Sequence, residues 1–323
     1  MKVCIVGAGA IGGFIGTRLA VAGRADVSAL ARGATLHALR TQGWRLEMGG
    51  ERLQAPARAS ADAAELGVQD LVVIAVKAPA LASVAAAIAP LLGPETVVLP
   101  AMNGVPWWFC ERVPGFERQP LRSVDPDGAI GRAIPFEQVI GCVVHASTAT
   151  PEPGLVRHRM GQGLIVGEPA GGRSERAQRV ADLLAQAGFD TTHSADIRQD
   201  TWYKLWGNLT INPVCAITGA TADAVLADPA VRDFCSAVMR EAAEIGARIG
   251  CPIAQTPEDR HAVTAKLGAF KPSMLQDVEA GRAVELDAIV GAVVEIAQRV
   301  GVVAPHTTAL LGLARLFART RGL

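Results

Sequence analysis

Three polar side chains recur at four-residue intervals within an otherwise apolar stretch. Lys204, Asn208 and Asn212 have the spacing i, i+4, i+8, which places them on one face of a helix, and tryptophan, leucine and isoleucine surround them. A polar row on an apolar helix must find partners or bear a desolvation cost, and a bound ligand would supply those partners. The alternative is an interior asparagine ladder satisfied by backbone groups, with Lys204 reaching water.

These residue types suit the reduction of a ketone that lies next to a carboxylate. When hydride reaches the carbonyl carbon, negative charge grows on the oxygen, which then needs a proton. A partly buried lysine can donate that proton as a general acid. Neutral donors such as Asn208 can hold the substrate carboxylate without a second charge. Pro213 follows Asn212 directly and is expected to kink the helix or leave a carbonyl free.

A glycine motif near the first residue could bind the hydride donor. The run 3–6 is apolar and largely β-branched, as in a buried strand, and Gly7, Gly9 and Gly12 follow in G-x-G-x-x-G spacing before a helix-like pattern. Gly7 permits the tight turn, Gly9 lets a pyrophosphate approach, and Gly12 lets the helix press on the strand. The helix N-terminus attracts phosphates. This context predicts a dinucleotide site, against the alternative of a glycine-rich turn without a ligand.

The residue after the second expected strand indicates which dinucleotide is bound. In NAD-binding units an acidic side chain about 20 residues past the fingerprint holds the ribose 2′-hydroxyl. Arg32 occupies that place here. A guanidinium suits a 2′-phosphate, because its planar fork donates two hydrogen bonds. The sequence therefore predicts NADPH, although Arg32 could also be a solvated loop residue.

Two further polar residues follow expected strands directly. Lys77 comes after the apolar run 71–76, and Asn103 follows the run 96–99. In an open α/β sheet, ligands lie beyond the carboxyl ends of the strands, so both side chains are expected to face the cofactor or the substrate. The ordinary alternatives are a surface lysine and a turn asparagine.

Strands and helices alternate for about 195 residues, the pattern of a doubly wound α/β domain. The expected strands are 26–30, 71–76, 96–99, 139–148, 155–156, 164–166 and 189–193, with a hairpin over 44–59. The expected helices are one ending at Gly23, 35–43, one capped by Ser60 and ending near Gly67, 79–92, and one over 174–188 capped by Ser174.

From residue 196 the pattern is helical only. Helices are expected at about 196–218, 229–250, 257–267, 273–281, 284–301 and 306–320. The chain is thus predicted to have a dinucleotide-binding domain over 1–195 and an all-helical substrate-binding domain over 196–323. The proline-rich segment 105–138, with Trp107 and Trp108, could be a lid or a packed surface loop.

Composition excludes several classes of protein. The 323 residues are 50% hydrophobic and 19% charged, as in a globular protein, and the 31 basic residues balance the 31 acidic ones, which disfavours nucleic acid and membrane surfaces as partners. No signal peptide or membrane span is expected. Six scattered cysteines without C-x-x-C pairs indicate reduced thiols in a cytoplasmic protein, and neither cysteine nor histidine spacing indicates a metal site.

Two polar residues in the last part of the chain have ordinary explanations by themselves. Ser273 and Gln276 match a capping box, and Glu285 on a helix face would be a solvated charge.

With these pieces together, the sequence resembles the ketopantoate reductase family, the NADPH-dependent 2-dehydropantoate 2-reductases of pantothenate and coenzyme A biosynthesis. The resemblance covers nearly the whole chain. It rests on GAGAIGG at 7–13, VKA at 76–78, Asn103-Gly104, the row from Lys204 to Pro213, and SMLQD at 273–277 followed by ELD at 285–287.

The resemblance implies a Rossmann-type domain followed by a helical one, with the active site in the cleft between them. It implies that Lys204 is the general acid, that Asn208, Ser273 and Glu285 bind substrate, and that Asn212 helps to position them. It also implies that Glu285 accepts a hydrogen bond from the substrate 4-hydroxyl and so selects against plain 2-keto acids. The residues implied to hold the cofactor are Gly7, Gly9, Ala10, Ile11, Gly12, Arg32, Lys77 and Asn103.

The sequence departs from the family pattern at two places. Segment 105–138 is longer than the pattern needs, and Thr221-Ala222 stand where some members carry another asparagine. The substrate could therefore be a different or bulkier 2-keto acid. Less favoured alternatives are a 3-hydroxyacid dehydrogenase and an NADP-binding regulatory protein that lacks activity. A homodimer is also conceivable, because helical domains with apolar faces often dimerise.

Overall fold

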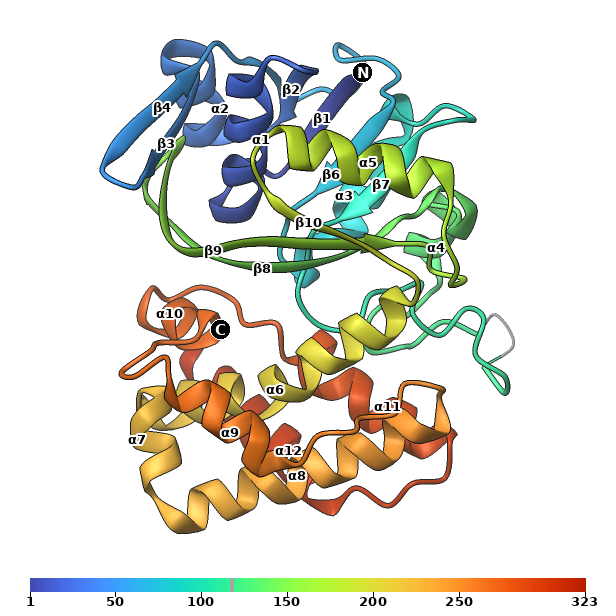
Figure 1. Cartoon of the computed structure of the whole chain (residues 1–323), viewed down its shortest axis with the longest axis vertical. Helices are drawn as coiled ribbons and strands as arrows, with labels where there is room; N and C mark the ends of the chain where they lie inside the picture. Colours follow the sequence, from blue (N-terminus) through green and yellow to red (C-terminus); the bar gives the residue numbers. More distant parts are fainter. Residues whose placement is uncertain (117–118) are drawn as a thin grey trace. The chain divides into compact units, whose positions relative to one another are not determined.

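A computed structural model describes residues 1–116 and 119–323, and these form two compact units (Figure 1). The first unit contains Met1–Met102 and Ala129–Asp200. The second unit contains Asn103–Gly128 and Thr201–Leu323. The division thus differs from a single boundary at residue 195, because the segment after the strand near residue 100 packs with the helices of the second unit.

The first unit contains a five-stranded parallel sheet with the strand order β5-β2-β1-β6-β7. Its strands are β1 (Lys2–Val6), β2 (Asp26–Leu30), β5 (Arg58–Ser60), β6 (Leu71–Ile74) and β7 (Val97–Pro100). The chain builds outward from β1 to β2 and β5, then continues on the other side with β6 and β7. The order therefore reverses between β1 and β6, and ligands bind outside the carboxyl ends of the strands at such a switch point.

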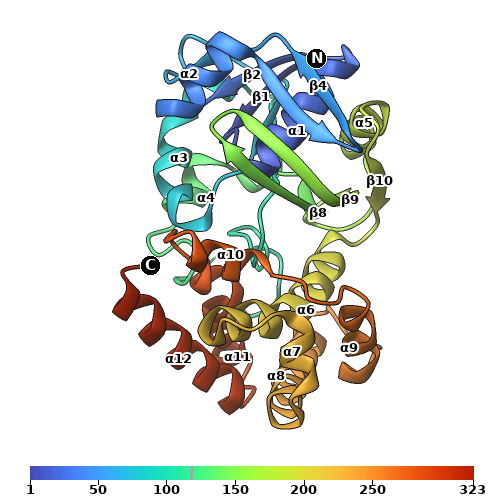
Figure 2. The same ribbon diagram turned by 90° about the vertical axis from the view of Figure 1, so that its left-hand side faces the viewer.

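A second sheet in the same unit has the order β10-β9-β3-β4, with β8 paired to β9. Its strands are β3 (Trp44–Met48), β4 (Glu51–Ala55), β8 (Gly141–Glu152), β9 (Leu155–Gly167) and β10 (Asp190–Ser194). β8 and β9 form a long hairpin (Figure 2). The prediction of separate short strands over 155–156 and 164–166 is wrong, since β9 runs through both.

The helices of the first unit flank these sheets. They are α1 (Ala10–Ala22), α2 (Gly33–Gln42), η1 (Ala78–Ala80), α3 (Leu81–Ala87), η2 (Ala89–Leu91), α4 (Ala129–Ala133), η3 (Phe136–Gln138) and α5 (Glu175–Gln186). Gly23 ends α1 in a left-handed conformation, with φ of 64°, and the Ser174 hydroxyl accepts a hydrogen bond from the Ala177 amide at 3.1 Å as the N-cap of α5. Both caps agree with the predictions.

One helix prediction in the first unit is wrong, and a second is confirmed in part. No helix follows Ser60, because its hydroxyl accepts from the Asp62 amide and donates to Glu65, which holds residues 61–66 in turns. The expected helix over 79–92 is α3 flanked by two short 3₁₀-helices.

Helix α1 lies between the two sheets. A Cβ on Gly12 would stand 3.0 Å from Ile5 of β1, one on Gly13 would stand 2.6 Å from Val156 of β9, and one on Gly16 would stand 2.6 Å from the Trp44 ring of β3. Because the helix is contacted from both sides, its glycines allow the close packing that fixes its N-terminus beside β1.

The second unit is helical. Its elements are α6 (Ile197–Thr218, which starts in the first unit), α7 (Ala222–Ala227), α8 (Pro229–Arg248), α9 (Pro257–Ala265), α10 (Ser273–Glu279), the π-helix η4 (Asp287–Gly291), α11 (Ala292–Arg299) and α12 (Pro305–Arg321). The sequence missed α7 and the π-helical turn. Helix α6 continues through Pro213.

The segment 103–128 is packed into the second unit. Trp107 and Trp108 are only 6% and 2% exposed, and the Phe109 ring stacks on Trp202 with centroids 5.8 Å apart. These contacts favour a packed loop over a lid for the described residues, whereas residues 117 and 118 of the same segment lie outside the described residues.

Glu295 of α11 binds the segment 103–128 through hydrogen bonds to Arg122 and Ser123. Its carboxylate accepts hydrogen bonds from the Arg122 amide at 2.9 Å, the Ser123 amide at 2.8 Å and the Ser123 hydroxyl at 2.7 Å, and it pairs with Arg299 at 2.6 Å. Burial opposes the charge, but these donors outweigh it and lower the pKa of Glu295.

We expect Glu295→Gln to lower the free energy of unfolding at neutral pH by about 1–3 kcal/mol, because the donors around Glu295 lose their charged acceptor. Since the folded-state pKa lies below the unfolded one, this stabilisation is present above the unfolded pKa and is lost as the pH falls through the folded pKa. Urea unfolding at neutral and acidic pH measures the difference. Glu244→Gln, at an exposed position of α8, is the control. Equal free energies of unfolding for the Glu295 variant and the parent at neutral pH would contradict a stabilising role of these hydrogen bonds.

The cysteines fit the expectation of buried thiols. All six are buried and none forms a disulfide, and burial raises the pKa of the Cys4 and Cys235 thiols to about 11. Within the described residues, no cluster of three His, Cys, Asp or Glu side chains could hold a metal ion. Over the same residues, no helix is long and apolar enough to cross a membrane.

Candidate functional site

The glycine turn between β1 and α1 has the geometry of an anion-binding loop. Gly7 adopts φ of 89°, and a Cβ there would stand 2.5 Å from Val76, so the turn requires glycine. Gly12 is equally constrained, because a Cβ would stand 2.1 Å from the Gly7 carbonyl oxygen. A Cβ on Gly9 would meet nothing within 4 Å, which leaves open space at the start of the helix.

The N-terminus of α1 can bind an anion in that space. Gly9 is the N-cap and offers no side-chain cap, and the first turn contains no acidic residue. The amides of Ala10, Ile11 and Gly12 lie in this first turn, where a helix supplies no acceptors of its own. They therefore point a partial positive charge at the open space beside Gly9.

Arg32 lies next to this turn. The Gly7 amide donates to the Leu30 carbonyl at 3.1 Å, which ties the glycine turn to the end of β2, and Arg32 follows two residues later as the exposed N-cap of α2. The structure therefore exposes the Arg32 side chain at the end of the second strand, beside the glycine turn.

Lys77 stands on the other side of the switch point. The Ala75 amide donates to the Val6 carbonyl at 2.9 Å, so the end of β6 lies against the end of β1. Lys77 is half-buried as the N-cap of the 3₁₀-helix η1, and it follows Val76, whose side chain would contact a Cβ on Gly7. The structure thus brings together the glycine turn, Arg32 and Lys77 at one edge of the sheet.

The second group of residues is positioned by α6. The indole nitrogens of Trp202 and Trp206 donate to the carbonyls of Ala242 and Met239 at 3.1 and 2.8 Å, which fixes one face of α6 on α8. Lys204 follows Trp202 by two residues, about 200° around the helix, and therefore faces away from α8. It is half-buried, as is Asn208, whereas Asn212 is buried.

Asn103 belongs with Lys204. The lysine ammonium donates to the Asn103 Oδ1 at 2.8 Å, and both residues are part of the second unit. The sequence predicted that Asn103 faces the cofactor or the substrate, and it gave no signal for this pair, since the residues are 101 positions apart. The contact therefore supplies the Lys204 ammonium with a hydrogen-bond acceptor inside the second unit.

Ser273 does not form the expected capping box. Pro272 is the N-cap of α10, so Ser273 is its first helical residue, and no side-chain cap is present. The Gln276 side chain donates instead to the Lys271 carbonyl at 2.7 Å. The hydroxyl of Ser273 is exposed, and helix capping does not explain its presence.

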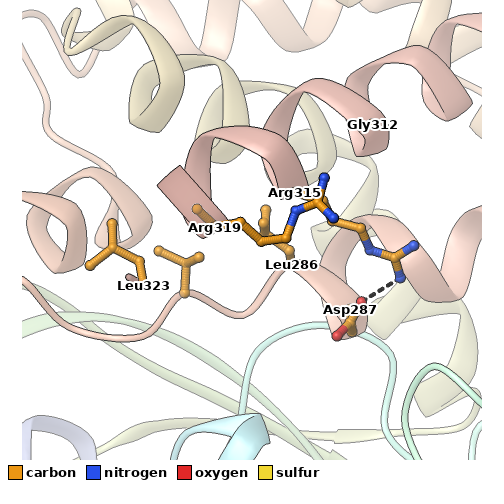
Figure 3. A pocket seen from close by; sticks show the side chains of 8 residues that line it. Leu286, Asp287, Gly312, Arg315, Arg319 and Leu323 are labelled. Carbon is orange, nitrogen blue, oxygen red and sulfur yellow. Dashed lines mark hydrogen bonds and ion pairs between the residues drawn. The ribbon is translucent and has the colours of Figure 1, made fainter. Parts of the chain in front are cut away.

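Glu285 is buried and not a solvated surface charge. Its side chain is 8% exposed, and it precedes the π-helix η4 by two residues. The first residue of η4, Asp287, accepts a hydrogen bond from Arg315 of α12 at 2.6 Å (Figure 3). Asp287 and Arg315 line a surface pocket of about 410 Å³ together with Leu286, Arg319 and Leu323.

Comparison with known proteins identifies the family of this chain. Residues 3–171 match the model of the family described as "Ketopantoate reductase PanE/ApbA", and residues 196–318 match the model of the C-terminal part of the same family. The chain is 45% identical over 323 residues to a 2-dehydropantoate 2-reductase of Mesorhizobium japonicum, covering 100% of this chain and 99% of the relative.

Solved structures give the same result. A proposed ketopantoate reductase of Ralstonia solanacearum is 56% identical, with a TM-score of 0.96 over 100% of this chain and 99% of that one. A PanE/ApbA family ketopantoate reductase of Ralstonia eutropha is 26% identical, with a TM-score of 0.85 over the full length of both chains. The named relatives are oxidoreductases, and this chain has the expected fold class, a Rossmann-like α/β domain followed by a helical C-terminal domain. The chain belongs to the ketopantoate reductase family.

Proposed function

We propose that the protein reduces 2-dehydropantoate to pantoate with NADPH, the step that serves pantothenate and coenzyme A synthesis. Lys204 would donate a proton to the carbonyl oxygen as the keto carbon receives a hydride, which NADPH would supply. The observation that carries the proposal is the half-buried Lys204 ammonium, which is directed by Asn103 at 2.8 Å and stands on the same helix face as Asn208.

The residues that would bind the cofactor lie in the glycine turn and at the ends of the strands. The amides at the start of α1 would hold the pyrophosphate, with Gly7 and Gly12 shaping the turn. Arg32 would bind the 2′-phosphate, and Lys77 would face the nicotinamide half. When bound, the cofactor supplies the hydride.

The substrate groups lie in the second unit. Asn208 and the exposed hydroxyl of Ser273 would bind the 2-keto acid, and Asn212 would help to position it. Glu285 would accept a hydrogen bond from the 4-hydroxyl. A homodimer and a cytoplasmic location remain predictions from the sequence.

Product analysis tests the reaction. Purified protein incubated with NADPH and 2-dehydropantoate is expected to form pantoate and NADP⁺ in equal amounts. NADPH consumption without pantoate, or no consumption, would overturn the proposal.

A different 2-keto acid is the second candidate, and one observation favours it. The backbone amide of Ala222 donates to the Phe270 carbonyl at 2.9 Å, so the Thr221-Ala222 pair lies against the loop that leads to Ser273. This pair stands where some members of the family carry an asparagine. Without the side-chain amide of that asparagine, a polar contact next to the proposed substrate site would be lost. The burial of Trp107 and Trp108 gives no such support to a bulkier substrate.

Arg32→Ala is expected to narrow the preference for NADPH over NADH by about 1–3 kcal/mol, because a charged hydrogen bond to the 2′-phosphate is lost. The ratio of kcat/KM for the two cofactors measures this change. Arg24→Ala, on an exposed residue at the other end of α1, is the control. An unchanged ratio would mean that another group holds the phosphate.

A further inference from the structure

We propose that Gly104 and Ala288 are positioning residues, which hold Asn103 where its amide oxygen directs the Lys204 ammonium. The inference rests on the proposed role of Lys204 as the general acid. All four residues belong to the second unit.

The first support is the close approach of the two backbones. Gly104 adopts φ of 84°, and a Cβ there would stand 2.8 Å from the carbonyl carbon, the carbonyl oxygen and the Cβ of Ala288. The next residue, Val105, donates its amide to the Ala288 carbonyl at 2.8 Å. Only glycine fits this position, both for its conformation and for the space available.

The second support is the place of Ala288 within a π-helix. The Ala292 amide bonds the Asp287 carbonyl across five residues, and this wider turn is found frequently at functional sites. Here the Ala288 carbonyl accepts a hydrogen bond from the distant Val105. Arg315 braces the turn through Asp287 (Figure 3), and Ala288 itself is 3% exposed.

The contact between Gly104 and η4 affects Lys204 through Asn103. Asn103 precedes Gly104, so the tie to η4 fixes the backbone that carries the amide oxygen 2.8 Å from the lysine. A lysine ammonium has three rotatable donors on a flexible stem and takes its direction from its acceptors. The same turn follows Glu285 by two residues, so one element positions both the acceptor of the acid and a substrate-binding carboxylate.

A double-mutant cycle tests this inference. Gly104→Ala is expected to lower kcat roughly 10- to 100-fold, because a displacement of about 1 Å at a reacting group can have that effect, while the Kd for NADPH changes little. In an Asn103→Ala background the same substitution should lower kcat by less than about twofold, since its effect passes through Asn103. A merely structural role would give the same loss in both backgrounds.

Gly115→Ala is the matched control. Gly115 also has φ of 84° and lies in the same loop, but a Cβ there would meet nothing within 4 Å. The Gly115→Ala variant therefore has the backbone strain of an alanine with positive φ, but its Cβ makes no contact with η4. A Gly104→Ala loss no larger than that of Gly115→Ala, or an undiminished loss in the Asn103→Ala background, would overturn the inference.

If Gly104→Ala does not fold, Ala288→Gly repeats the cycle from the other side of the contact, with Ala297→Gly in α11 as the buried helical control. It should lower kcat more than the control does, and again only when Asn103 is present. All variants are assayed on the 2-keto acid that the parent enzyme turns over fastest. Failure of the parent on every 2-keto acid overturns the proposed function, whereas an active parent with additive variants overturns only the positioning role.

Discussion

Lys204→Ala should lower kcat by roughly 10²–10⁴-fold, because the growing oxyanion then lacks its proton donor. NADPH binding should persist, since the glycine turn and Arg32 are in the first unit and do not depend on the amine. Steady-state assays give kcat, and fluorescence titration gives the Kd for NADPH. An unchanged kcat would remove Lys204 from the mechanism.

Two further variants separate proton donation from charge. Lys204→Arg keeps the positive charge, but a guanidinium does not give up its proton in proteins, so activity should stay low. Lys266→Ala, at an exposed lysine of the same unit, should leave kcat unchanged. High activity of the arginine variant would indicate electrostatic stabilisation without proton transfer.

Glu285→Ala should remove most of the discrimination between 2-dehydropantoate and 2-ketoisovalerate, which lacks the 4-hydroxyl. A hydrogen bond to a charged group contributes about 1.5–3 kcal/mol, which corresponds to roughly 10- to 150-fold in kcat/KM for 2-dehydropantoate. The value for 2-ketoisovalerate should change little, because that substrate makes no such bond. The ratio of the two kcat/KM values is the measurement.

Glu285→Gln should fall between the parent and Glu285→Ala, since the amide oxygen still accepts a hydrogen bond but carries no charge. Glu279→Gln, at an exposed position of α10, is the control. An equal loss for both substrates would assign Glu285 a structural role and leave the selectivity to another residue.

Local signals predicted the elements that form the glycine turn. The β-branched run of β1, the glycine spacing and the C-cap at Gly23 are all encoded within about 20 residues, and the structure has each of them. The row on α6 also follows from local periodicity. Non-local pairing could not be predicted in the same way, because alternation along a strand does not say which sheet the strand joins. The second sheet around α1 was therefore missed.

Two predictions from local motifs were wrong, because neighbouring residues determine the role of each serine. Ser60 has the type of an N-cap, but it lies in an edge strand and its hydroxyl is engaged by Asp62 and Glu65. Ser273 matches a capping box, but Pro272 takes the N-cap position. The pairs Lys204–Asn103 and Val105–Ala288 had no sequence signal, since their partners are more than 100 residues apart and meet only through tertiary packing.

A substrate panel with NADPH oxidation as the readout tests the central claim most directly. The panel compares kcat/KM for 2-dehydropantoate, 2-ketoisovalerate and larger 2-keto acids. We expect the highest value for 2-dehydropantoate, well above that for 2-ketoisovalerate. Poor turnover of 2-dehydropantoate beside good turnover of another 2-keto acid would contradict the account.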